Sequence, residues 1–458
     1  MTDTTERPQT TAGVPASRLA SLRRREDARF TESRPHSRAL LERARGSMPN
    51  GVPMSWMVEL YEHPPIFVAS GEGATFTDVD GHRYFDTNIG DMSTFCGINP
   101  PAVVEAVARQ ARRGLQYLLP IEDALWVAED LTRRFRLPQW QFTLSATLAN
   151  VEAIRLCRFV TGRPVVLMFE GKYHGHAEEW LVDPKDGALR PAYPGVPPSA
   201  GAWVRHVPFN DPEALARALQ PGDVACVVTE PALTNCGVIE PDPGFHQALR
   251  ALTRRRGTLL VIDEAHTLVC GPGGLTARLG LEPDVITLGK FIAGSVPLGA
   301  YGMTAGLAQR FARPDPASPR AAFASGGTLF ANALSMTAAR AALEHVLTEE
   351  AYARTAELGA RLADGIEERC RRRGFDWRAH RLFARSGYCY GPALPRNASD
   401  YHATMRPDLY HLMRVYFANR GVWEAIGTAG PTVSVAAAPA DIDHYLACLD
   451  EFLGELSA

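Results

Sequence analysis

An aspartate and a lysine, Asp263 and Lys290, each lie at the end of a short apolar run of the sequence. The runs, residues 258–262 and 285–288, are aliphatic or β-branched and bounded by turn-forming residues, as buried strands are. In an open α/β sheet, ligands bind outside the carboxyl ends of the strands. The interval between the two residues is long enough for one crossover, so we expect their side chains to meet at one edge of a sheet.

A lysine and a carboxylate at neighbouring strand ends suit the cofactor pyridoxal phosphate. This cofactor forms a Schiff base with a lysine, and it needs an acid group beside its ring nitrogen so that the ring can withdraw electrons. The alternative is a solvated surface pair, because most Lys and Asp side chains are exposed. Polar segments after other predicted strands favour the cofactor interpretation.

The segment at residues 142–158 reads as a strand, a tight turn at Ser145, Ala146 and Thr147, and then a helix. Free backbone N–H groups at a helix start, together with a threonine hydroxyl, can bind a phosphate. The alternative is an ordinary strand–turn–helix in which Thr147 is the N-cap of the helix.

Further side chains at predicted strand ends or turns could surround a planar ring. Tyr173 can present its aromatic face to such a ring. We interpret His174 as a hydrogen-bonded structural histidine rather than a catalytic one. Glu230 and Asn235 lie in a loop where the cofactor would lie, although loop positions of this kind are often simple turn residues. Thr328, in a glycine-rich segment, could supply another hydroxyl to a phosphate.

The composition is that of an ordinary globular protein of 458 residues, with 46% hydrophobic and 22% charged residues. A net charge of −3 gives no reason to expect nucleic acid or an anionic membrane as a partner. No apolar run approaches the roughly 18 residues of a membrane span, and the N-terminus lacks the apolar core of a signal peptide. The eight cysteines show no metal-binding spacing, so we expect reduced thiols, no metal and a cytoplasmic protein.

The sequence predicts a large domain inserted into a smaller one. Residues 1–35 are polar and are expected to form a flexible tail. Residues 36–98 contain a meander of short strands and would begin the small domain. Residues 99–335 alternate helix and strand, which indicates a parallel sheet between helices, and residues 336–458 would complete the small domain. The strands expected in the large domain are 140–144, 164–169, 223–229, 258–262 and 285–288.

Together these segments resemble the class III pyridoxal-phosphate aminotransferases, and within them glutamate-1-semialdehyde aminomutase and the β-amino-acid aminotransferases. The resemblance runs from about Gly51 to the C-terminus, with order and spacing in agreement. It implies an α/β protein of PLP fold type I, with a mostly parallel seven-stranded sheet between helices and a smaller α+β domain. It also implies a homodimer with shared active sites. The motifs that carry it are GEGATFTDVDGHRYFD, SATLAN, KYHG, EPALTNCGVIEPDPGF, IDEAHT, LGKFIAG and GGTLFAN.

The resemblance implies a role for individual residues. Lys290 would form the Schiff base and move protons, and Asp263 would pair with the ring nitrogen. Thr328 would reach the phosphate of the partner subunit. The other residues implied to bind the cofactor are Ser145, Ala146, Thr147, Tyr173, Glu230, Asn235, Ala265 and His266.

The sequence departs from the family where the substrate would bind. The phosphate turn carries Leu148 in place of the usual glutamate. The loops at residues 51–60 and 421–435 lack the arginine with which relatives hold a carboxylate, although Arg385 could replace it. The predicted substrate pocket is therefore lined by Met54, Trp56, Met57 and Glu424.

The resemblance implies an aminotransferase that moves an amino group from an amino acid or amine to a keto or aldehyde acceptor through Lys290. An isomerase, either an aminomutase or a racemase, would use the same residues and is the alternative. Retention of Lys290 and Asp263 disfavours a non-catalytic member of the family. Metal hydrolases and dinucleotide enzymes are disfavoured because their motifs are missing.

Overall fold

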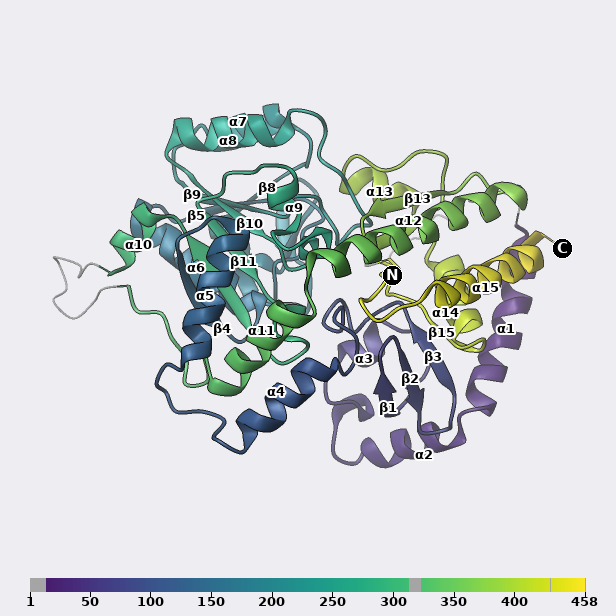
Figure 1. Ribbon diagram of the computed structural model, residues 1–458. Helices are drawn as coiled ribbons and strands as arrows, with labels where there is room; N and C mark the ends of the chain where they lie inside the picture. The colour runs from purple at the N-terminus through teal and green to yellow at the C-terminus, as the bar shows by residue number, and fades with distance from the viewer. Residues whose placement is uncertain (1–13, 313–322, 429, 458) are drawn as a thin grey trace.

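The computed structural model describes residues 14–312, 323–428 and 430–457. Its largest element is a seven-stranded sheet, seen on the left of Figure 1. The sheet is mostly parallel, as predicted, because only β12 runs antiparallel to its neighbours. In spatial order its strands are β4 (Gln139–Thr143), β12 (Gly299–Met303), β11 (Val285–Leu288), β10 (Leu259–Asp263), β9 (Val224–Thr229), β5 (Val165–Phe169) and β8 (Val204–Val207).

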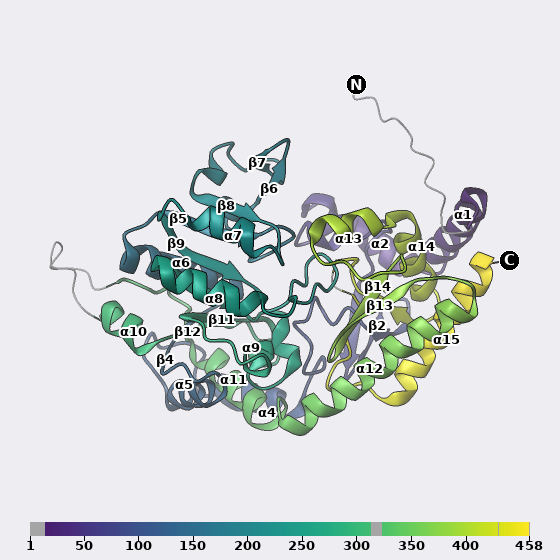
Figure 2. The same cartoon turned by 90° about the horizontal axis from the view of Figure 1, so that it is seen from above.

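The strands form this sheet because their side chains are buried on both faces. In β5, Val166 and Met168 pack into one core with helix α6 (Ala146–Thr161), whereas Leu167 and Phe169 pack into the core on the other face. Helices therefore cover both faces (Figure 2). The other helices of this region are α4 (Pro101–Ala111), α5 (Glu122–Phe135), α7 (Pro212–Leu219), α8 (Phe245–Arg256), α9 (Gly274–Arg278), α10 (Ala305–Ala312) and α11 (Ala333–His345).

Two strands of the sheet, β8 and β12, were absent from the sequence prediction. The strand β12 contains two glycines, which weaken a strand pattern. Both glycines lie where the chains approach closely: a Cβ on Gly302 would come within 2.6 Å of the Trp140 ring, and one on Gly299 within 2.2 Å of the Ser145 carbonyl oxygen. Packing of β12 against β4 and the turn after β4 therefore requires glycine at both positions. The same glycines weaken the strand pattern in the sequence.

The second lobe joins segments from both ends of the chain (Figure 1). Its four-stranded sheet has the order β1 (Val68–Glu72), β2 (Thr75–Asp78), β3 (Arg83–Asp86) and β15 (Val422–Trp423). The helices that belong to it are α1 (Ala16–Glu32), α2 (Pro35–Ala44), α3 (Trp56–Glu59), α12 (Glu349–Arg372), α13 (Ala398–Thr404), α14 (Pro407–Ala418) and α15 (Pro439–Ser457). Two hairpins, β6 (Val182–Lys185) with β7 (Ala188–Pro191) and β13 (Arg378–Leu382) with β14 (Arg385–Cys389), complete the strands. The short 3₁₀ helices are η1 (Pro49–Gly51), η2 (Glu178–Trp180), η3 (Ala200–Trp203), η4 (Thr267–Cys270) and η5 (Lys290–Ala293).

Residues 1–35 were expected to form a flexible tail, but about half of this segment is helical in the structure. Helix α1 spans Ala16–Glu32 and packs against α14. Leu19, Leu22 and Phe30 are buried on one face of α1, at the spacing of a helix. Residues 1–13 of the expected tail lie outside the described residues.

Three further features bear on the sequence predictions. All eight cysteines are buried and none forms a disulfide. Over the described ranges, no helix is both long and apolar enough to span a membrane. The same part of the chain has no group of three or more His, Cys, Asp and Glu side chains placed to hold a metal ion.

Candidate active site

A cavity of about 340 Å³ lies at the carboxyl ends of β10 and β11, and both Asp263 and Lys290 line it. Asp263 is the last residue of β10, and Lys290 begins the 3₁₀ turn η5 that follows β11. The two strands pair in parallel, with Asp263 opposite Thr287. Parallel pairing therefore brings the two side chains to the same edge of the sheet, where the sequence predicts them.

Asp263 is held by three hydrogen bonds. Its Oδ2 accepts one from Asn150 Nδ2 at 2.8 Å and is joined to His174 Nδ1 at 2.9 Å, while Oδ1 accepts one from the backbone N–H of Ala265 at 2.9 Å. Burial alone would raise the pKa of this carboxyl, but the bonds from His174, Ala265 and Asn150 outweigh burial and hold the pKa below its ordinary value. Asp263 is therefore ionised at neutral pH.

Asn150 is a part of the site that the sequence analysis did not single out. Its amide also donates to the backbone oxygen of His174 at 2.9 Å, and its Oδ1 accepts a hydrogen bond from Thr287 Oγ1 at 2.6 Å. One side chain thus links α6, the His174 segment, β10 and β11. The signal in the sequence is a polar side chain in a helix that is otherwise largely apolar on its buried face. His174, interpreted from sequence as a hydrogen-bonded residue, has that environment here.

The turn before α6 forms the opposite wall of the cavity. Ser145, not Thr147, is the N-cap of α6, because its side chain accepts from the backbone N–H of Leu148. Ala146 and Thr147 line the cavity beside it. Two neighbouring segments approach this turn so closely that only glycine fits: a Cβ on Gly289 would lie 2.7 Å from the Ala146 nitrogen, and one on Gly175 would lie 2.2 Å from Thr147 Oγ1.

Lys290 points its amino group at an acid that the sequence analysis did not name. Its Nζ donates to Asp91 Oδ2 at 2.8 Å and to the backbone oxygen of Asp91 at 3.0 Å. Lys290 itself has φ of 54°, in the left-handed region that non-glycine residues rarely adopt. Strained backbone of this kind persists where the surrounding structure enforces it, often at functional sites.

The remaining side chains expected around the cofactor also line the cavity, namely Tyr173, Glu230, Asn235, Ala265 and His266. The Glu230 carboxylate accepts hydrogen bonds from the Asn235 side chain and the Thr234 N–H, and burial raises its pKa. Burial also holds the pKa of His266 well below its usual value, so this imidazole is neutral. Its Nδ1 lies 2.7 Å from Thr234 Oγ1.

The four residues predicted for the substrate pocket lie in different places. Trp56 lines the cavity, with its ring 5.6 Å from that of Tyr173. Met54 and Met57 are 49% and 42% exposed and are not among the described residues that line it. Thr328 is exposed and is likewise outside the cavity of its own chain.

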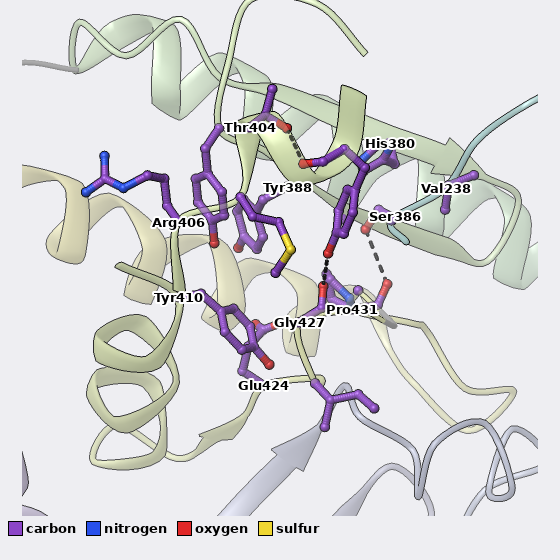
Figure 3. Close-up of a pocket in the computed structure, with 17 residues that line it drawn as sticks. Val238, His380, Ser386, Tyr388, Thr404, Arg406, Tyr410, Glu424, Gly427 and Pro431 are labelled. Carbon is purple, nitrogen blue, oxygen red and sulfur yellow. Dashed lines mark hydrogen bonds between the residues drawn. The ribbon is translucent and has the colours of Figure 1, made fainter. Parts of the chain in front are cut away.

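Glu424 lies in a different cavity, and its assignment to the substrate pocket is therefore corrected. That cavity, in the second lobe, has a volume of about 30 Å³ and includes Tyr388 and Tyr410 in its lining (Figure 3). Glu424 directly follows β15, whose pairing with β3 fixes where the loop begins, and the residue is 2% exposed. The loop sequence alone does not reveal this placement.

Arg385 is fully buried beside the active-site cavity without lining it. Its guanidinium donates to the backbone oxygens of Thr234 and Thr428, at 2.6 and 3.3 Å, and Nη1 lies 3.2 Å from His266 Nδ1. Among the described residues that line the cavity, none is an arginine. These contacts to the backbone favour a structural role for Arg385 over the carboxylate binding considered from sequence.

The cavity fits pyridoxal phosphate. It combines a lysine with an ionised, hydrogen-bonded carboxylate, a helix N-terminus and an aromatic ring, within a volume typical of cofactor sites. Because Gly175 and Gly289 have no side chains, the space beside the start of α6 stays open.

Comparisons with known proteins agree with this geometry. The family model described as Aminotransferase class-III matches residues 57–374. A glutamate-1-semialdehyde 2,1-aminomutase from Chloroflexus aggregans is 35% identical over 86% of this chain and 91% of its own length. The crystal structure of a glutamate-1-semialdehyde-aminomutase from Pseudomonas aeruginosa PAO1 superposes with a TM-score of 0.92 at 39% identity, covering 97% of this chain and all of that one. A β-phenylalanine aminotransferase from Variovorax paradoxus gives 0.84 at 29% identity, covering 96% and 97%.

Proposed function

This chain belongs to the class-III aminotransferase family, and we propose that it is an aminomutase, which moves an amino group between two carbons of one molecule. Its fold is PLP fold type I and its cofactor is pyridoxal phosphate. The observation that carries the proposal is the similarity, over nearly the whole chain, to proteins named aminomutases. It favours the alternative given from sequence over transfer between two molecules.

We propose a separate role for each of several residues of the cavity. When bound, the cofactor supplies an aldehyde that condenses with amines and a ring that withdraws electrons. Lys290 binds it and then moves a proton at the reacting carbon of the substrate. Asp263 keeps a proton on the ring nitrogen, because its own pKa is held low. His174 and Asn150 position Asp263 and hold it ionised.

The other wall of the cavity is proposed to hold the phosphate. Ser145, Ala146 and Thr147 bind it at the start of α6, where a helix N-terminus favours an anion. Tyr173 covers the ring. Thr328 reaches the phosphate from a second copy of the chain in a homodimer, which accords with its exposure outside its own cavity.

A second candidate function is transfer of an amino group between two molecules. It is supported by the likeness to the β-phenylalanine aminotransferase, and the proposed catalytic residues would be the same. The donor would be an amine or amino acid and the acceptor a ketone or aldehyde.

One experiment separates the two functions. The purified enzyme, loaded with cofactor, is incubated with glutamate-1-semialdehyde and no other acceptor. An aminomutase converts it to the isomer with the amino group on the neighbouring carbon, over many turnovers and without releasing a deaminated product. A strict requirement for a separate keto or aldehyde acceptor would overturn the proposal in favour of the aminotransferase.

A further inference from the structure

The segment before α4 contains four successive residues in the left-handed conformation. Their φ angles are 42° at Ile89, 57° at Gly90, 51° at Asp91 and 75° at Met92. Only glycine adopts this region without cost, and a β-branched residue such as Ile89 is a genuine outlier there. A turn of this kind requires strong support from its surroundings.

That support comes from both ends of the turn. Ile89 and Met92 are each 1% exposed and belong to the core of the large lobe. The backbone N–H of Ile89 donates to Asp86 Oδ1 at 2.8 Å, and the oxygen of Ile89 accepts from the N–H of Thr94 at 3.0 Å. The core thus holds both apolar side chains inward, and Asp91, one of the two residues between them, lines the cavity.

Asp91 uses this conformation to present two acceptors to one nitrogen. Its carboxylate and its backbone oxygen both accept hydrogen bonds from Lys290 Nζ, at 2.8 and 3.0 Å. The Asp91 side chain is 34% exposed, so it faces the open space of the cavity as well as the lysine. A group that binds at Lys290 therefore lies beside a carboxylate.

Asp91 differs from the other two acids of the cavity in the groups that it contacts. Asp91, Glu230 and Asp263 are the acids of the described lining, and Lys290 is its one Lys or Arg. Asp263 is bound by His174 and Asn150, and Glu230 by Thr234 and Asn235. Asp91 instead contacts the amine of Lys290, which the reaction uses.

We propose that Asp91 determines which substrates the site accepts, because it accepts a hydrogen bond from a nitrogen bound at Lys290. Its carboxylate accepts a hydrogen bond from the amino group that reacts there, and it repels a carboxylate on the carbon that carries that amino group. The favoured class is thus primary amines whose reacting carbon bears no carboxylate. The inference rests on the proposed function, because it takes Lys290 to be the residue that binds the cofactor.

The test compares two probes that differ by one carboxylate, benzylamine and phenylglycine. The cofactor is first fixed to the enzyme with borohydride, and the affinity of each probe for this unreactive form is measured by calorimetry. The rate at which each probe, in a single turnover without acceptor, removes the yellow colour of the untreated holoenzyme gives a second ratio. Asp91→Asn removes the charge, keeps the shape and retains a residue type that tolerates positive φ. Asp186→Asn is the matched control, because Asp186 also has positive φ, at 53°, but is exposed on the β6–β7 hairpin.

We expect the wild type and Asp186→Asn to prefer benzylamine, and Asp91→Asn to reduce that preference by about tenfold or more in both ratios. An unchanged preference in Asp91→Asn, or a wild type that binds phenylglycine as well as benzylamine, would overturn the inference. So would a wild type that binds neither probe. Failure of the proposed role of Lys290 is seen separately, because borohydride would then leave the cofactor on another residue or on none.

Discussion

Asp263 and Glu424 are both buried carboxylates, 3% and 2% exposed, but their environments differ. Asp263 lies at a strand end among hydrogen-bond donors, and its pKa is lowered despite burial. Glu424 lies in the small tyrosine-lined cavity of Figure 3, where burial raises its pKa to about 7 and Tyr445 and Arg414 offset this only partly.

The difference shows that burial alone does not fix the charge of an acid. The donors around Asp263 come from α6, from the His174 segment and from the backbone after β10, so three parts of the fold stabilise one negative charge. Glu424 accepts a hydrogen bond from the neighbouring N–H of Ala425, at 3.1 Å. An acid held ionised can serve a cationic ring, whereas an acid that is partly neutral near pH 7 links stability to pH.

The largest effect is expected from Asp263→Asn. The amide has the same shape but cannot hold the cofactor's ring nitrogen protonated, so kcat should fall by roughly a thousandfold or more. Glu424→Gln makes the same acid-to-amide change in the other cavity and should leave kcat near the wild-type value. Steady-state kinetics on both variants, with circular dichroism as a check of folding, tests the contrast. Similar rates for the two variants would contradict it.

A smaller effect is expected from His174→Ala, which removes one of the groups that hold Asp263 ionised. Hydrogen bonds that orient metal ligands are worth about 10- to 100-fold in affinity or activity, and we expect a loss of that order here. Because His174 lowers the pKa of Asp263, its removal should move the acid limb of the kcat–pH profile to higher pH. An acid limb that stays in place would show that His174 does not act through Asp263.

The smallest effect is expected on stability, from Glu424→Gln. Since folding raises the pKa of Glu424 from 4.5 to about 7, its contribution to the free energy of unfolding is full below pH 4.5 and is lost as the pH rises through 7. The wild type should therefore lose up to about 3 kcal/mol from this group between pH 4.5 and pH 8. Asp86, whose pKa burial also raises to about 7, will keep part of the dependence in both proteins.

Melting curves at pH 5 and pH 8 measure this difference. The variant should lose less stability than the wild type on going to pH 8. Equal losses in the two proteins would mean that the pKa of Glu424 is the same in the folded and unfolded chains, so that its burial does not link stability to pH.

The local sequence pattern predicted those strands that are buried on both faces and are therefore largely aliphatic. The aliphatic runs of β10 and β11 indicated strands, and parallel pairing then fixed where Asp263 and Lys290 meet. The strand β12 was missed because close chain contacts require glycine there. Asn150 was missed because its partners come from distant segments and no spacing in the sequence connects them.

The substrate side was harder to predict for the same reason. Asp91 reaches Lys290 because the core holds a left-handed turn, a long-range effect that the residues of the turn do not reveal. Glu424 was placed in the wrong cavity because the position of its loop depends on the pairing of β15 with β3. Sequence therefore predicted the positions of residues at strand ends better than the positions of residues in loops from the second lobe.

The central claim, that Lys290 carries the cofactor, has an unusually direct test because the chain contains only three lysines, Lys172, Lys185 and Lys290. Lys172 donates to the backbone oxygen of Val182, and Lys185 is exposed on a hairpin, so Lys290 is the lysine of the cavity. The holoenzyme is reduced with borohydride, digested and mapped by mass spectrometry. The cofactor mass should be found on Lys290, and Lys290→Ala should lose both the yellow colour and the label. A label on Lys172 or Lys185, or a Lys290→Ala variant that remains yellow and active, would contradict the account.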